Sequence, residues 1–303
     1  MIVAENLTKR YGTRTAVSDA SFAVRPGMVT GFLGPNGAGK STTMRMIVGL
    51  DRPTSGRATV NGRAYATSPS PLTEVGTLLD AKAVHTGRSA RNHLRAMAAT
   101  HGIPLSRVDE VLEITGIASV ARKRAGGFSL GMGQRLGIAS AILGDPTTLI
   151  LDEPVNGLDP EGVRWVRDFV RSYAAAGRTV LLSSHLMSEM ALTADHLIVL
   201  GRGRVLADAS VAQLVAAWTK EDVAVETPNP DALASALASD SVAVQRTGTN
   251  ALAVSGAPAA WIGDRAAAAG IAIHQLTTRT GSLEEAYMAL TGDAVEYKTK
   301  ELA

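Results

Sequence analysis

The chain has no cysteine among its 303 residues. Without thiols it cannot form disulfides or thiolate metal sites, which is consistent with a protein of the cytosol. Nowhere does the sequence hold about 18 consecutive apolar residues, the minimum for a membrane-spanning helix. Its first ten residues also lack the basic and apolar regions of a signal peptide. We therefore expect that any role at a membrane depends on a partner.

The chain also lacks an excess of either charge. It has 30 Lys and Arg against 28 Asp and Glu, for a net charge of +2. A dedicated nucleic-acid binder usually carries a basic surface, so no nucleic-acid partner is expected. Hydrophobic residues make up 46% of the chain and charged residues 19%, as in folded globular proteins. The length fits one large domain or two ordinary ones.

Residues 34–42, Gly-Pro-Asn-Gly-Ala-Gly-Lys-Ser-Thr, fit the phosphate-loop pattern G-x-x-x-x-G-K-[ST]. The apolar residues 28–33 before them predict a buried strand, and residues 42–48 predict a helix, which is the context the motif requires. The glycines let several N–H groups converge on one phosphate, while Lys40 would reach the β- and γ-phosphates and Ser41 would ligate Mg²⁺. The predicted nucleotide-binding residues of this loop are Gly34, Pro35, Asn36, Gly37, Ala38, Gly39, Lys40, Ser41 and Thr42.

Two further apolar runs end in polar residues. Residues 147–151 are followed by Asp152 and Glu153. Beside a phosphate loop, one such carboxylate can hold the magnesium shell and the next can polarise water. His185 follows the run 179–183, at the carboxyl end of a strand, where α/β sheets bind their ligands. We predict Asp152 as a metal ligand, and Glu153 and His185 as catalytic residues.

Tyr11 has two interpretations from sequence alone. It can stack on adenine, or it can cover a sheet edge at a turn. Residues 84–145 are dominated by Ala, Leu, Arg and Met at helical spacing and predict a helical subdomain. The three histidines in this region are eight residues apart and would not share a helix face, so we expect no metal site there.

The C-terminal part shows a different pattern. A turn-rich boundary is predicted at residues 219–230. Residues 231–292, with a strand at 223–226, have a β-α-β-β-α-β order, which predicts a small ferredoxin-like α+β domain. Its last helix would begin with a capping box made by Ser282 and Glu285. Residues 293–303 are expected to form a tail.

Together, the motifs over residues 1–218 resemble the ATP-binding cassette (ABC) ATPases. The resemblance identifies residues 34–42 as the Walker A motif and 149–154 as the Walker B motif with the catalytic Glu153. It makes Asp159 part of the D-loop, His185 the switch histidine and Tyr11 the adenine-stacking aromatic. The fold it implies is α/β, a P-loop NTPase with a mixed sheet core and antiparallel β and helical subdomains.

Two motifs depart from the family's common form. Residues 128–132, Phe-Ser-Leu-Gly-Met, stand where the family commonly has the signature L-S-G-G-Q. The resemblance implies that Ser129, Leu130, Gly131 and Met132 contact ATP held by a second copy of the chain. Asp80 stands where the family has the Q-loop glutamine, and a carboxylate there could also contact Mg²⁺.

The ending at residues 282–292 resembles the bacterial drug-exporter branch, which includes daunorubicin- and bacitracin-resistance ATPases. This implies a homodimeric motor subunit that uses ATP and Mg²⁺. It would sit on the cytoplasmic face of the cell membrane through a separate multi-span permease, which binds an unidentified small-molecule or lipid cargo such as a drug or antibiotic.

Three alternatives are weaker. A soluble cassette ATPase acting on ribosomes or DNA usually has two cassettes or a long coiled coil, and this chain has one cassette and no heptad run. An unrelated phosphate-loop GTPase would need an Asn-Lys-x-Asp motif, which is absent. A regulatory subunit without activity would not need the complete set of Lys40, Asp152, Glu153 and His185.

Overall fold

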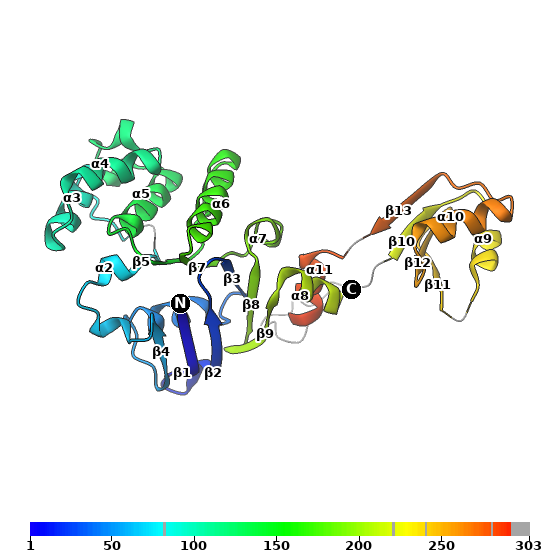
Figure 1. Ribbon diagram of the computed structural model, residues 1–303, viewed down its shortest axis with the longest axis horizontal. Helices are drawn as coiled ribbons and strands as arrows, with labels where there is room; N and C mark the ends of the chain where they lie inside the picture. Colours follow the sequence, from blue (N-terminus) through cyan, green and yellow to red (C-terminus); the bar gives the residue numbers. More distant parts are fainter. Residues whose placement is uncertain (81–82, 220–221, 240, 280, 292–303) are drawn as a thin grey trace. The chain divides into compact units, whose positions relative to one another are not determined.

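The computed structural model describes residues 1–80, 83–219, 222–239, 241–279 and 281–291 (Figure 1). The chain forms two compact units, one from residues 1–211 and the other from residues 212–290. Helix α8 (Val211–Trp218), at the end of the residues 1–218 over which the resemblance extends, lies almost entirely in the second unit. The predicted tail at 293–303 lies outside the described residues. No helix in the described parts of the chain is long and apolar enough to span a membrane.

The first unit is organised around a six-stranded sheet with the order β5-β6-β7-β3-β8-β9. Its strands are β3 (Val29–Leu33), β5 (Val75–Leu78), β6 (Thr148–Leu151), β7 (Thr179–Ser183), β8 (His196–Gly201) and β9 (Arg204–Ser210). All neighbouring strands are parallel except β9, which pairs antiparallel with β8. The carboxyl ends of β6, β7 and β3 therefore meet at one edge, which is where ligands bind in such sheets.

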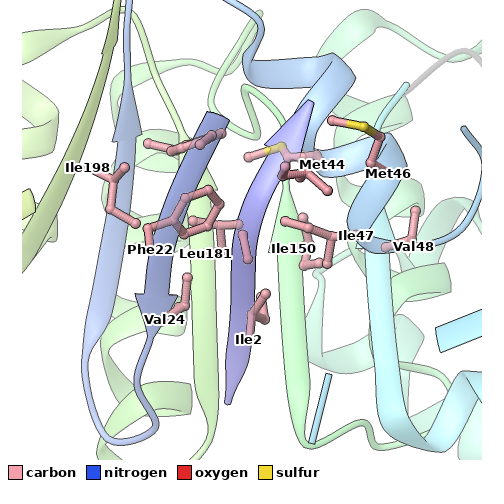
Figure 2. Packing of buried hydrophobic residues seen from close by; sticks show 14 of the residues in the cluster. Ile2, Phe22, Val24, Met44, Met46, Ile47, Val48, Ile150, Leu181 and Ile198 are labelled. Carbon is pink, nitrogen blue, oxygen red and sulfur yellow. The ribbon is translucent and has the colours of Figure 1, made fainter. Parts of the chain in front are cut away.

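A second, antiparallel sheet has the order β2-β1-β4 and is formed by β1 (Ile2–Tyr11), β2 (Arg14–Val24) and β4 (Ser55–Val60). Helix α1 (Lys40–Ile47) contributes Met44 and Ile47 to a core shared with both sheets. Figure 2 shows these side chains with Phe22 from the antiparallel sheet and Ile150 from the central sheet. This buried contact fixes the helix that follows the phosphate loop.

The helical subdomain contains α3 (Ala90–Thr100), α4 (Leu105–Ile114) and α5 (Leu130–Ile142). Leu94, Val111 and Leu136 are fully buried in it. Burial lowers the pKa of His93. The described residues contain no group of three or more His, Cys, Asp or Glu side chains placed to hold a metal ion.

Three more helices belong to the first unit: α2 (Pro71–Glu74), α6 (Pro160–Ala175) and α7 (Met187–Thr193). Proline at the first position of α6 fits this place, because its missing N–H would have no partner within the helix. Helices α6 and α7 follow strands β6 and β7, respectively, and so begin near the edge where the strand ends meet.

The second unit has the predicted ferredoxin-like order. It contains β10 (Asp222–Glu226), α9 (Pro230–Leu237), β11 (Ala243–Arg246), β12 (Ala251–Ser255), α10 (Ala259–Ala268) and β13 (Gln275–Arg279). The strands form one antiparallel sheet with the order β11-β12-β10-β13. Val225, Leu233, Leu252 and Ile262 form its core.

The predicted capping box is confirmed at α11 (Leu283–Thr291). The Glu285 backbone N–H donates to Ser282 Oγ at 3.1 Å, and the Ser282 N–H donates to Glu285 Oε2 at 3.0 Å. Each side chain thus satisfies an N–H group that the first turn of the helix leaves without a partner.

Candidate active site

The phosphate loop joins the end of β3 to the start of α1. Gly37 and Gly39 have φ values of 83° and 102°, which side-chain-bearing residues rarely adopt. A Cβ atom on Gly39 would also lie 2.6 Å from the carbonyl oxygen of Ala16. Residues 35–42 line a cavity of about 310 Å³ together with Tyr11, Arg14 and Ala16. The predicted nucleotide-binding residues, except Gly34 at the base of the loop, therefore surround one hollow.

Lys40 is buried beneath this loop. Its Nζ donates to the carbonyl oxygen of Gly34 at 2.6 Å and to that of Pro35 at 3.4 Å. Burial lowers the pKa of Lys40, and the nearby carboxylates of Glu153 and Asp152 act in the opposite direction. The ammonium group is thus held at the base of the cavity, where it could bind phosphate oxygens.

A chain of hydrogen bonds links the loop to the ends of β6 and β7. Ser41 Oγ donates to Asp152 Oδ2 at 2.6 Å, and Ser183 Oγ donates to Asp152 Oδ1 at 2.5 Å. The Ser183 hydroxyl also accepts the backbone N–H of Glu153 at 2.9 Å. A single hydroxyl therefore holds both consecutive acidic residues.

Ser41 and Asp152 fit a magnesium site by their chemistry. They bring a hydroxyl and a carboxylate oxygen together beside the phosphate cavity, and Mg²⁺ is commonly held by one or two protein oxygens with phosphate and water. Asp80 lies two residues beyond β5, whose Leu78 carbonyl accepts the N–H of Asp152 at 2.7 Å. Asp80 therefore follows the strand next to β6.

Glu153 has a strained backbone. Its φ is 50°, in the left-handed region that costs a residue with a side chain roughly 1–2 kcal/mol. Three neighbours hold it: Ser183 accepts its N–H, Gln134 Nε2 donates to its carbonyl at 3.2 Å, and His185 Nδ1 lies 2.8 Å from its Oε2. This fixed carboxylate could orient a water molecule, with His185 beside it.

Tyr11 is 48% exposed at the end of β1. Its hydroxyl donates to Asp51 Oδ2 at 3.0 Å, and Arg45 Nε donates to the same oxygen at 2.8 Å. Lys9 Nζ lies 4.9 Å from the centre of the ring. The ring is held by these contacts at the wall of the cavity, where an adenine could stack on it.

The signature and D-loop residues lie at helix starts. Ser129 caps α5 by accepting the N–H of Met132 at 3.2 Å, and Asp159 caps α6 by accepting the N–H of Gly162 at 2.9 Å. Leu130 and Gly131 stand in the first turn of α5. None of the predicted signature or D-loop residues lines the phosphate cavity of its own chain.

Several site residues were not found from the sequence. Ser183 ends the apolar run 179–183, and a polar residue at the end of such a strand is the signal that marks it. Gln134 lies two residues beyond the signature segment 128–132, and no local pattern marks its contact with Glu153. Asp51 and Arg14 carried no signal, because their places beside Tyr11 and the cavity depend on how distant strands pair.

The chain is similar to known proteins. A family model described as ABC transporter matches residues 17–156. The bacitracin transport ATP-binding protein BcrA of Bacillus licheniformis is 41% identical over 209 residues, which are 68% of this chain and 68% of that protein. The chain belongs to the family of ABC transporter ATP-binding proteins. As a member it is an ATP-binding ATPase, which confirms the resemblance inferred from the motifs.

This ABC ATPase is also similar to the lantibiotic transport ATP-binding protein SrtF of Streptococcus pyogenes, with 35% identity over 206 residues, 68% of this chain and 89% of that protein. A solved dimeric ATP-binding cassette in a post-hydrolysis state, bound to ADP and Pi, has the same fold: the TM-score is 0.64 at 20% identity, covering 69% of this chain and 98% of that chain. A domain of unknown function matches residues 221–284.

The double role of Ser183 gives a first prediction. Replacing Ser183 with Ala removes the donor to Asp152 Oδ1 and the acceptor of the Glu153 N–H, while Ser41 still donates to Asp152 Oδ2; we expect a kcat about 10-fold lower and a loss of about 1–3 kcal/mol in unfolding free energy. ATPase assays and thermal unfolding measure the two effects. Ser140→Ala removes a hydroxyl that bonds only within its own helix and serves as the control. A wild-type kcat for Ser183→Ala would contradict this role.

Proposed function

We propose that this ABC ATPase is the motor subunit of an exporter for drugs, antibiotics or lipid-like compounds. The observation that carries the proposal is the connected set of hydrogen bonds that runs from Ser41 through Asp152 and Ser183 to Glu153 and His185. It joins a phosphate-binding loop to a fixed carboxylate and a histidine, as ATP hydrolysis requires. The names of the bacitracin and lantibiotic transport relatives support the export of such compounds.

Each residue then has a role. The N–H groups of the loop and Lys40 bind the phosphates, and Tyr11 stacks on the adenine. Glu153 accepts a hydrogen bond from the attacking water, and His185 contacts the γ-phosphate. Bound Mg²⁺, held by Ser41 and Asp152, would neutralise charge on the phosphates.

The site is completed by a second copy of the chain. Ser129, Leu130, Gly131 and Met132 at the start of α5 would meet the γ-phosphate of ATP held by the partner, where helix N–H groups favour an anion. Asp159 would lie at the same interface. Support comes from the dimeric solved structure of the same fold and from the absence of these residues from the cavity of their own chain.

The motor would act at the cytoplasmic face of the membrane through a separate multi-span permease that binds the cargo. ATP binding would close the dimer and hydrolysis would reopen it, so the permease would alternate between two states. The alternative, a soluble cassette ATPase on ribosomes or DNA, is less favoured because the relatives are named as transport proteins.

Glu153→Gln tests the hydrolytic role. The amide keeps the size of the side chain but is a much poorer base, so we expect ATP affinity to stay near wild type and kcat to fall by about 100-fold or more. Nucleotide titration and phosphate release measure the two effects. Lys40→Ala is the contrasting variant, because it should lose affinity. Normal turnover by Glu153→Gln would remove this residue from the mechanism.

The same variant tests the transport role. We expect tagged Glu153→Gln, held closed by Mg-ATP, to bring a multi-span permease out of detergent-solubilised native membranes, because the ATP-bound state persists. Lys40→Ala, treated in the same way, should recover less of it. Recovery of ribosomal proteins or DNA without any membrane protein would contradict the exporter proposal and leave the ATPase assignment intact.

Asp80 is proposed as a further magnesium contact. If its carboxylate meets the ion directly or through water, Asp80→Asn should raise several-fold the Mg²⁺ concentration that gives half-maximal hydrolysis. Asp264→Asn, an exposed change in the second unit, is the control. An unchanged Mg²⁺ dependence would exclude Asp80 from the site.

A further inference from the structure

The start of helix α5 lies directly on the loop that precedes α6. Gly157 in that loop has a φ of 74°, and a Cβ atom on it would lie 2.5 Å from Leu130 Cγ and 3.0 Å from Leu130 Cβ. A Cβ atom on Gly131 would lie 3.1 Å from the carbonyl oxygen of Gly157. The Leu130 side chain therefore packs against bare backbone, and a Cβ atom at position 157 would clash with Leu130 in its present position.

The same face of α5 also reaches Glu153. Gln134 is four residues after Leu130 and thus one turn further along this face. It is only 5% exposed, and its Nε2 donates to the Glu153 carbonyl oxygen at 3.2 Å. Helix α5 therefore contacts both ends of the segment 153–157: Leu130 packs on Gly157, and Gln134 donates a hydrogen bond to Glu153.

A third contact ties α5 to the helix after this loop. The guanidinium of Arg135 lies 4.7 Å from the ring centre of Trp165 on α6, which stands beside α5 in Figure 1. The Arg135 side chain also donates to the Thr115 carbonyl at 3.0 Å, at the end of α4. Helix α5 is thus in direct contact with the loop, with α6 and with the end of α4, all within one chain.

We propose that Leu130 is a positioning residue for hydrolysis. Because Leu130 packs on Gly157, the signature segment and the segment that carries Glu153 move together. A displacement of α5 also moves the strained Glu153 backbone, through the hydrogen bond from Gln134. A phosphate of the partner's ATP that pulls on Ser129 would thus set the orientation of the Glu153 carboxylate in the same chain. This inference rests on the proposed hydrolytic role of Glu153.

A double-mutant cycle in the full-length chain tests the contact between Leu130 and Gly157. Gly157→Ala places a methyl group against Leu130, so we expect kcat to fall about 10-fold or more while the KM for ATP changes less than about threefold, because the phosphate loop of each copy is untouched. Leu130→Gly removes the obstructing side chain. It should lower kcat by itself, because the contact between Leu130 and Gly157 is lost. In that background, Gly157→Ala should cost no more than the control Gly177→Ala. Gly177 has a similar φ of 81° but open space around its Cβ position.

The opposite results overturn the proposal. An equal loss of kcat from Gly157→Ala in both backgrounds would show that only backbone strain acts there. A rise in KM in place of the fall in kcat would indicate a role in nucleotide binding. If Gly157→Ala does not fold, Gln134→Met decides the question: it keeps the size but not the N–H donor, and a wild-type kcat would remove the link to Glu153. Normal turnover by Glu153→Gln would defeat the proposed function itself, whatever the cycle shows.

Discussion

The hydrogen bond from Ser41 Oγ to Asp152 Oδ2 joins two residues that are 111 positions apart, and the proposed catalytic arrangement depends on it. It forms because β7 lies between β3 and β6 in a parallel sheet, so that the three strands end at one edge. The arrangement depends equally on the hydrophobic core that lies between helix α1 and the sheet. Met44 of α1 packs in one cluster with Ile150 of β6 and Leu181 of β7, so the helix and both strands hold a fixed relation. Burial of these apolar side chains sets the distance at which the polar atoms above them meet.

The strain at Glu153 has a physical cause in the same region. A residue with a left-handed backbone is stable only where its surroundings over-determine it. Ser183 from β7 and Gln134 from α5 each contribute one hydrogen bond, and His185 after β7 contributes two, from its backbone N–H and its ring, both to Glu153 Oε2. Ser183, which also donates to Asp152, is the last residue of β7, and His185 follows the same strand. Gln134 is on helix α5. The position of the carboxylate is therefore sensitive to the helical subdomain as well as to the sheet.

Much of this could be predicted from sequence, because local patterns determine it. The phosphate loop has its own glycines and flanking apolar runs, and the acidic pair directly follows an apolar strand. The β-α-β-β-α-β order and the capping box at Ser282 are also local. The contacts of Ser183 and Gln134 could not be predicted, since each depends on the register between elements far apart in the chain. The unit that α8 joins is not a local property either: its residues favour a helix, but only packing decides which unit it joins.

The unusual signature segment can be understood from the same packing. The common family form has a glycine where this chain has Leu130, and the close approach of α5 to the loop leaves room for only one side chain between them. In this chain the Leu130 side chain occupies that space, and Gly157, which has no side chain, allows it to do so. The leucine is also 51% exposed, so it is not explained by core burial alone. The departure at position 130 is therefore compatible with an intact site because position 157 compensates for it, and the two positions are best regarded as one structural unit.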